Sequence, residues 1–535
     1  MTFLVDSSLD FARAHVDAFG DSDFFPPRDE FVAINAGWDA IKQYLTASNV
    51  EKLPVEAPRS MPAPKARGGY RIVHQLESLG ALTYTALAHM VAGQVEVSRV
   101  PASIAFSYRL SVSANSFFAS GNGYQPFVSR CRDLAGTHAF VFAADIADFY
   151  NRTYVHRVEN AITSAGCPGN LGKALEHFLL ALNGKNSQGI PVGPAASIVM
   201  AEAVMTDRDQ FIGNYGLQHA RYVDDFRIFS SSRDDLERFE EQFVQHLFEI
   251  HRLQLAPGKT SITETASFAD RIGAPAEVER RELLELAQAV CDYGDQYTLS
   301  DIEALAQKFL EPTKPRARPA ASGWWQQMLR AIDRHEERER ETIRNGLISE
   351  LFEEGLRKTP LDLGLVRHAL RQGSRWGSPN MIGPVLRNIA FIEPALPDAF
   401  TYLNAVYSDD LAEEHIDAIR ALVQSQGFKR SRFVQHWTYW FLTSKPRLVA
   451  DAALGPKIWN DSPVEWQARA ARTTRNLAKV RQHKSALGSF GLWDRRSLLM
   501  SSEVMPALER AAWLGSITPR DPVEQSIVRW AKAKP

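Results

Sequence analysis

Residues 221–229, which read RYVDDFRIF, constrain the fold more than any other part of the chain. Apolar and polar residues alternate on both sides of two adjacent carboxylates, Asp224 and Asp225, and this pattern predicts a short β-hairpin with the acids at its turn. Two neighbouring carboxylates repel each other unless a cation lies beside them. The pair therefore predicts a divalent-metal site, and oxygen-only ligation favours Mg²⁺ or Mn²⁺. Asp-Asp is also ordinary turn chemistry, so the hairpin alone leaves both interpretations open.

A further acidic position follows an apolar run upstream. Residues 138–144 (HAFVFAA) predict a buried strand, and Asp145 stands where that strand ends. Asp148 and Asn151 have a simpler explanation, as caps of a helix expected to begin near Tyr154. Together with the hairpin pair, Asp145 would complete a three-acid set that can hold two metal ions about 3.5–4 Å apart for in-line phosphoryl displacement.

Between the two acidic segments lies a loop rich in glycine and proline. Residues 187–194 (SQGIPVGP) lead into 195–204, which predict a helix, and Pro194 suits the first turn of that helix. The small residues would let a nucleotide or a template backbone come close. Alone the loop is weak evidence. Its place between the acidic strand and the double-acid hairpin gives it meaning.

In this order, the segments resemble motifs A, B and C of the palm of reverse transcriptases. A fourth segment resembles motif D, and two upstream segments resemble the fingers blocks whose basic side chains meet the incoming triphosphate. The match spans about residues 65–260, less than half of the chain. The matching segments are 145–150 (A), 188–197 (B), 222–225 (C), 253–260 (D), and 67–71 and 106–109 (fingers, the latter ending at Arg109).

The resemblance implies that Asp145, Asp224 and Asp225 are the catalytic acids and the metal ligands, with Mg²⁺, or else Mn²⁺, as the cofactor. Lys259, in the motif D segment, would protonate the departing pyrophosphate. Most lysines are only surface charges, and that explanation of Lys259 stays open.

The resemblance also implies a pocket for deoxynucleoside triphosphates. Tyr150 would be the steric gate, because a bulky ring under the sugar clashes with a 2′-hydroxyl. Gln188 and Gly189 would shape the pocket. Arg71 would pair with triphosphate oxygens through its planar guanidinium, although a solvated loop arginine is the competing explanation.

Length and composition limit the class of protein. A chain of 535 residues predicts two or three domains, and 45% hydrophobic with 23% charged residues is typical of a soluble globular protein. No apolar stretch approaches the roughly 20 residues that cross a bilayer, and the N-terminus lacks a signal-peptide pattern. The three scattered cysteines form neither a disulfide framework nor a zinc pattern. We therefore expect a cytoplasmic protein that does not bind membranes.

Beyond the palm-like segment, the sequence predicts helices. Apolar residues recur at helical spacing from about residue 274 onward, and residues 361–441 suggest successive helical hairpins that resemble a HEAT-like solenoid. Pro-rich stretches at 53–64 and 311–319 punctuate the chain. The expected fold class is α+β, with an N-terminal helical segment at 1–64, a reverse-transcriptase fingers-palm domain at 65–273 and an α-helical, HEAT-like domain at 274–535.

The end of the chain is basic and rich in tryptophan. Residues 466–535 hold 13 Lys/Arg against 5 Asp/Glu, interleaved with Trp466, Trp493, Trp513 and Trp530. Basic side chains attract phosphates, and indole faces can stack on bases. Packing of the tryptophans in a helical core is the alternative. We expect packing for most of the tryptophans and nucleic-acid contact for part of the basic surface.

A fingers-palm unit followed by about 260 helical residues resembles the abortive-infection class of bacterial reverse transcriptases, which defend against phage. Residues 260–264 (TSITE) lack the Val-Thr-Gly signature of retron enzymes. The resemblance implies template-independent DNA synthesis, a DNA product attached covalently to the protein, and a homo-oligomer. A tyrosine would be the usual primer, and the candidates are Tyr44, Tyr293, Tyr297, Tyr402, Tyr407 and Tyr439.

Two other functions stay open. One is a conventional reverse transcriptase of a retroelement, which copies an RNA template. The other is a non-catalytic palm that serves as a nucleic-acid-binding scaffold. Against the scaffold stands the complete set of acids together with the gate tyrosine and the lysine, because a decayed palm should have lost at least one of them.

Overall fold

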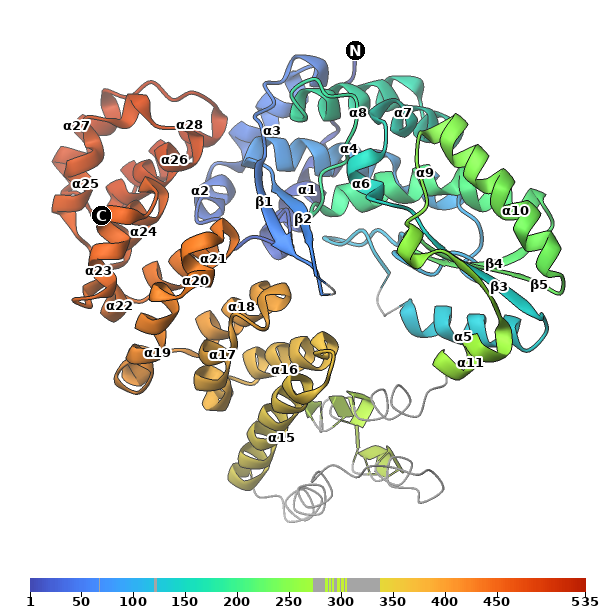
Figure 1. Ribbon diagram of the computed structural model, residues 1–535. Helices are drawn as coiled ribbons and strands as arrows, with labels where there is room; N and C mark the ends of the chain where they lie inside the picture. Colours follow the sequence, from blue (N-terminus) through green and yellow to red (C-terminus); the bar gives the residue numbers. More distant parts are fainter. Residues whose placement is uncertain are drawn as a thin grey trace. The chain divides into compact units, whose positions relative to one another are not determined.

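The computed structural model describes residues 1–66, 68–119, 123–272 and 337–535, and parts of 284–305. The chain divides into two compact units (Figure 1). The first unit comprises Met1–Met61, Ile72–Ile272 and Ala507–Pro535, and the second comprises Pro62–Arg71 and Gly273–Pro506. The Pro-rich segment 311–319 lies outside the described residues.

This division differs from the expected domains 1–64, 65–273 and 274–535 at the end of the chain. Helices α27 (Ala507–Gly515) and α28 (Pro522–Lys532) belong to the first unit. The reason is that α28 packs against α2 (Phe31–Ala36) and α3 (Trp38–Ala47) near the N-terminus. A contact between the two ends of a chain of this length leaves no local signal in the sequence.

The first unit is built around a four-stranded antiparallel sheet in the order β4-β5-β3-β6. The predicted buried strand is confirmed as β3 (Phe140–Asp145), and the predicted hairpin as β4 (Gln218–Tyr222) and β5 (Asp225–Ser230). The edge strand β6 (Ser261–Glu264) follows the motif D segment. Because β3 and β5 are neighbours in the sheet, the end of β3 lies beside the start of β5.

Alternation along the strands buries side chains on both faces of this sheet. Helix α10 (Arg233–His246) covers one face, where Phe142 and Phe226 contact Phe239 and Phe243 with ring centroids 5.8–6.3 Å apart. Helices α5 (Tyr124–Ala135) and α11 (Thr265–Ile272) cover the other face. The core on that side contains Phe127, Cys131, Leu134, Val141, Ala220, Phe229 and Phe268.

Further helices complete the first unit. Helix α4 (Ser78–Ser98) is buried along most of its length and contacts α1 (Asp6–Phe19), α8 (Gly169–Leu182) and α9 (Ala195–Asn214). Helix α7 (Val155–Ser164) packs on α8 and α9. The hairpin of β1 (Arg59–Pro64) and β2 (Tyr70–Gln75) precedes α4.

Apart from the strand residues in Pro62–Arg71, the regular structure described in the second unit is mainly helical, and Figure 1 shows its helices following one another in chain order. Contacts run from α15 to α16, α16 to α18, α18 to α21, α21 to α24 and α24 to α26, so each helix packs mainly on near neighbours in the sequence. This is the packing expected of a solenoid. The helices are α15 (Glu337–Arg357), α16 (Leu363–Arg375), α17 (Ile382–Asn388), α18 (Leu396–Val406), α19 (Ala412–Gln424), α20 (Gln426–Arg430), α21 (Arg432–Thr443), α22 (Pro446–Ala450), α23 (Leu454–Pro456), α24 (Val464–Thr473), α25 (Leu477–Lys484) and α26 (Leu492–Ser501).

Three expectations from the composition concern membrane spans, cysteines and tryptophans. Over the part of the chain that the structure describes, no helix combines the length and apolar character needed to cross a membrane. The three cysteines are free and buried. Trp466 and Trp513 are buried, in agreement with the expectation that most of the tryptophans pack in a helical core.

Candidate active site

The predicted acids meet at one end of the sheet. Tyr222 pairs with Asp225 across the hairpin, so Val223 and Asp224 form its two-residue turn, and Val223 takes a positive φ of 57°. Asp225 is the first residue of β5 and lies directly opposite Asp145, the last residue of β3. Directly opposite residues on antiparallel strands project their side chains from the same face. Two strands and one turn therefore bring the three carboxylates to one place.

The motif D segment is tied to the end of β3. Backbone hydrogen bonds join Ala147 N–H to Gln254 C=O (2.9 Å) and Ala256 N–H to Asp145 C=O (2.8 Å). This pairing positions the 3₁₀ turn Pro257–Lys259, and Lys259 Nζ donates to Asp145 Oδ2 at 2.7 Å. The structure thus brings Lys259 to the acids, as its predicted role requires. Lys259 forms an ion pair with one of the three acids, Asp145.

The electrostatics of the acids are those of a cation site. Burial, together with the nearby Asp145 carboxylate, raises the pKa of Asp224 to about 6. Burial also raises the pKa of Asp225, although Arg227 acts in the opposite direction. The guanidinium of Arg227 donates hydrogen bonds to both carboxylate oxygens of Asp225, and one of these bonds is 3.1 Å long. A divalent cation would relieve this crowding of negative charge, so the donor set fits Mg²⁺ or Mn²⁺.

The three carboxylates are not drawn together as tightly as a bound metal would draw them. Within the described residues, their oxygens do not all come within 4.8 Å of one another. Asp145 and Asp225 each bind a basic side chain instead, Lys259 and Arg227 respectively. Metal binding would therefore exchange two ion pairs for metal–oxygen bonds.

A buried charge network that we did not predict supports the Asp224 turn. Arg221, on β4, is fully buried and binds Glu202 (3.0 Å) and Asp209 (2.7 Å), both on α9. It also donates to Val223 C=O at 2.8 Å, so its guanidinium links the helix to the turn. Buried charges are costly unless they are paired and hydrogen-bonded, and this arginine satisfies both conditions. The signal for this network in the sequence was the charged Arg221 between apolar positions of the predicted strand.

Ser107 and Arg99 extend the network. Ser107 Oγ accepts from Val223 N–H (2.8 Å) and donates to Glu202 (3.1 Å), so it holds the turn from the other side. Arg99 pairs with Glu202 at 2.7 Å. Arg109, expected among the basic side chains that meet the triphosphate, pairs with Glu96 and donates to Val100 C=O at 2.8 Å. In this structure Arg109 is therefore part of the support.

Backbone hydrogen bonds join the glycine-proline loop to the segment that carries Tyr150, the predicted gate residue. Ile190 N–H donates to Tyr150 C=O (2.8 Å), and Gly189 N–H donates to Thr153 C=O (2.9 Å). Gln188 forms an isolated bridge with Tyr154. Gly189 has a φ of +110°, a region that L side chains rarely adopt, so glycine is needed there. The structure brings Tyr150, Gln188 and Gly189 together.

Tyr150 is half-buried in the short helix α6 (Phe149–Arg152). Burial raises its pKa well above the ordinary range, with smaller contributions from Glu202 and Asp224, so the phenol stays neutral. The influence of Asp224 places the ring in the electrostatic field of the acid turn. A bulky ring near the Asp224 turn is the arrangement that the predicted steric gate requires.

One expectation about neighbouring polar residues needs correction. Asp148 and Asn151 do not cap the helix near Tyr154, because α7 begins after Tyr154 without a side-chain cap. Asp148 instead precedes α6 in the left-handed conformation and accepts from Asn151 Nδ2 at 2.8 Å. Arg71 lies on β2, and its role at the triphosphate stays a prediction.

Comparison with known proteins agrees with this geometry. Residues 63–284 match the family model for reverse transcriptase (RNA-dependent DNA polymerase). No curated protein matches the chain. Similar solved structures include apo telomerase from Candida tropicalis, at a TM-score of 0.32 and 11% identity over 76% of this chain and 74% of that one. Telomerase from Candida albicans, in complex with a TWJ fragment of telomeric RNA, gives 0.31 and 10% over 74% and 67%.

Proposed function

We propose that the reverse transcriptase domain present at residues 63–284 catalyses magnesium-dependent transfer of deoxynucleotides to a hydroxyl primer. The observation that carries this proposal is the pairing of Asp145 with Asp225 beside the Asp224 turn. Asp145, Asp224 and Asp225 would hold the metal ions, which when bound would activate the attacking hydroxyl and neutralise the charge that develops on the phosphate.

The chain's own residues have separate tasks in this proposal. The network of Arg221, Glu202 and Ser107 fixes the turn that carries Asp224, because each of them bonds to the turn or to another member. Lys259, which is exposed over 60% of its side chain, can leave Asp145 and give a proton to the departing pyrophosphate.

Selection of the sugar would come from Tyr150 and the loop bonded to it. The hydrogen bond from Ile190 to the Tyr150 carbonyl fixes the backbone that carries the ring. Gln188 and Gly189 would form the neighbouring wall of the pocket for the deoxynucleoside triphosphate. A ring held in this way rejects a 2′-hydroxyl by overlap, so its effect does not depend on its own hydroxyl group.

We further propose that the chain belongs to the abortive-infection class and makes DNA without a template, primed by its own tyrosine, in cytoplasmic defence against phage as a homo-oligomer. This finer proposal rests on the resemblance of the sequence. Among the priming candidates, Tyr402, Tyr407 and Tyr439 are buried, which argues against them, whereas Tyr44 and Tyr297 are half-buried. Tyr293 lies outside the described residues.

The second candidate function is RNA-templated synthesis by a retroelement enzyme, which the match to an RNA-dependent DNA polymerase family favours. A denaturing gel separates the two. Purified protein is incubated with Mg²⁺ and labelled deoxynucleotides, without template or primer, and half of each sample is treated with nuclease. Labelled DNA that migrates with the protein, and that nuclease treatment shortens, supports protein priming. Incorporation only with an annealed primer-template supports the retroelement function, and no incorporation under either condition contradicts both.

A further inference from the structure

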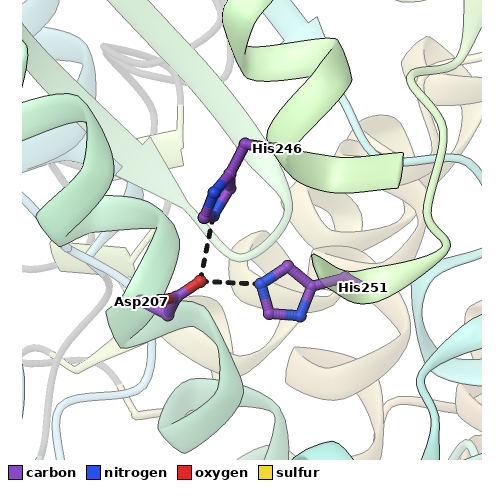
Figure 2. A group of neighbouring side chains, drawn as sticks. All are labelled: Asp207, His246 and His251. Atoms are coloured by element: carbon purple, nitrogen blue, oxygen red, sulfur yellow. Dashed lines mark hydrogen bonds and ion pairs between the residues drawn. The ribbon is translucent and has the colours of Figure 1, made fainter. Parts of the chain in front are cut away.

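A second cluster of metal-ligating side chains lies in the first unit, and it is not the acid set. Asp207 on α9, His246 at the end of α10 and His251 converge on one point, as Figure 2 shows. Asp207 Oδ2 lies 3.1 Å from His246 Nε2 and 2.6 Å from His251 Nε2. Within the described residues, this is the only group of three whose ligand atoms all lie within 4.8 Å of one another.

The backbone makes an unusual turn to bring the two histidines together. Residues five apart on an α-helix are rotated by about 140° and cannot share a face. After His246, however, the chain forms a π-helical turn, Leu247–His251, and Arg252 N–H bonds to Leu247 C=O. A π-turn is closed by a hydrogen bond between residues i and i+5, and such turns occur frequently at functional sites. Here it places His246 and His251 around the same carboxylate oxygen.

The rings are held in place by their surroundings. The side chain of His246 is 15% exposed and that of His251 is 6% exposed, while Asp207 is half-exposed. His246 stacks on Phe211 with centroids 4.2 Å apart, and the two imidazoles meet edge to face at 5.4 Å. A metal would therefore find ligands that have already lost their rotational freedom.

We propose that Asp207, His246 and His251 bind one transition-metal ion of the zinc type. Two imidazoles and one carboxylate are a ligand set for Zn²⁺, whereas Mg²⁺ prefers oxygen ligands alone. Zinc–nitrogen bonds of about 2.0–2.1 Å at tetrahedral angles separate the ligand atoms by about 3.3 Å. The observed separations of 3.1 and 2.6 Å would need to widen by about 0.2 and 0.7 Å to reach this value.

A fourth position is reachable from solvent. Asp207 and His251 line a pocket of about 480 Å³ between α7 and α9, with Arg157, Asn160 and Thr206 on its walls. Three protein ligands with a water molecule in the fourth position are a known coordination of zinc in proteins. His251 Nδ1 is buried and has no hydrogen-bond partner among the described residues, so in the metal-free chain this ring satisfies only one of its two nitrogens.

The position of the site suggests what the ion would do. Asp207 lies on α9 between Glu202 and Asp209, the two acids that hold Arg221 beneath the catalytic turn. A metal ion bound to Asp207 and to His246 at the end of α10 would link α10 to α9, the helix that carries Glu202 and Asp209. Zinc binding would thus stabilise the first unit without entering the chemistry.

The test is zinc binding to the full chain, purified with chelator and kept in Mg²⁺ so that the oxygen-ligated site is satisfied. We expect one Zn²⁺ per chain by titration calorimetry and a higher melting temperature with zinc. His246→Gln and His251→Gln should each weaken binding by at least about tenfold. The control is His156→Gln, because His156 is 66% exposed and lies 3.4 Å from Glu176, a surface site for adventitious metal.

Asp207→Asn is the alternative test variant if a histidine variant fails to fold. Asn keeps an oxygen that accepts from both imidazoles, so the hydrogen-bonded arrangement survives while the charge on the metal ligand is lost. Unchanged zinc affinity in Asp207→Asn, or equal losses in His156→Gln and His251→Gln, would overturn the proposal. So would the absence of stoichiometric binding to the wild-type chain. Because each readout is metal binding or melting, the result is independent of polymerase activity.

Discussion

Asp145 and Asp225 lie directly opposite each other on β3 and β5, and each is bound to a basic side chain. Lys259 neutralises Asp145 and Arg227 neutralises Asp225, while Asp224 has a pKa raised to about 6 by burial and by Asp145. Two of the three carboxylates are therefore already paired with basic side chains. Metal ions must compete with these ion pairs, and this competition can be measured.

Replacing Lys259 with Met should separate metal binding from catalysis. The side chain of Lys259 is 60% exposed, and ion pairs of this kind contribute at most about 1 kcal/mol. We therefore expect up to about fivefold tighter Mg²⁺ binding, but a kcat lower by about 10²-fold because the proton donor is lost. Calorimetry and single-nucleotide incorporation measure the two effects. Lys173→Met, at an exposed position on α8, is the control, and equal kcat in both variants would contradict the role of Lys259.

Ser107→Ala tests whether the buried network positions the Asp224 turn. The change removes the acceptor for Val223 N–H and a donor to Glu202. We expect a loss of about 1–3 kcal/mol in the free energy of unfolding, because a buried N–H is left unsatisfied. The kcat should also fall, while the KM for the deoxynucleotide stays near its wild-type value. The exposed Ser113→Ala should change neither quantity. A stability loss with unchanged kcat would reduce Ser107 to a packing role.

The gate is tested by two substitutions at one position. Tyr150→Ala should raise incorporation of ribonucleotides relative to deoxynucleotides by at least about tenfold, since the overlap with the 2′-hydroxyl is worth more than 1.4 kcal/mol if it discriminates at all. Tyr150→Phe keeps the ring and should keep the selectivity. If both variants discriminate like the wild type, the gate lies elsewhere.

How far the sequence predicts this site depends on the range of each interaction. The hairpin and the apolar strand have local patterns, so their existence and the position of the acids within them were predictable. The charged Arg221 could be recognised in the sequence of the predicted strand. Its partners Glu202 and Asp209 could not be predicted, because they lie on a helix whose contact with β4 leaves no pattern in the sequence. The histidine cluster depends on a π-turn, which no spacing rule for an α-helix predicts.

Acid should loosen the loop that carries Gln188 and Gly189 through His74. His74 exchanges two hydrogen bonds with Val192: its N–H donates to the Val192 carbonyl (2.8 Å), and its Nδ1 accepts from Val192 N–H (3.0 Å). Burial lowers the pKa of His74 below the 6.5 of a free histidine. The unfolded chain therefore binds more protons below pH 6.5, and the stability that neutral His74 contributes is lost as the pH falls from there.

His74→Asn isolates this contribution. The Asn side-chain oxygen can accept from Val192 N–H but does not titrate. Urea unfolding at pH 7.5 and 5.5 should show a larger loss of stability for the wild type than for His74→Asn. Identical losses would show that His74 does not control the pH dependence.

The most direct test of the central claim is incorporation of labelled deoxynucleotides by Asp224→Asn, compared with the wild type and Asp148→Asn at equal Mg²⁺. Asp148 is half-exposed and left-handed, a conformation that Asn adopts readily, so it controls for the loss of one nearby carboxylate. We predict that Asp224→Asn abolishes incorporation and that Asp148→Asn retains it. Incorporation by Asp224→Asn at the wild-type rate would contradict the assignment of the acids.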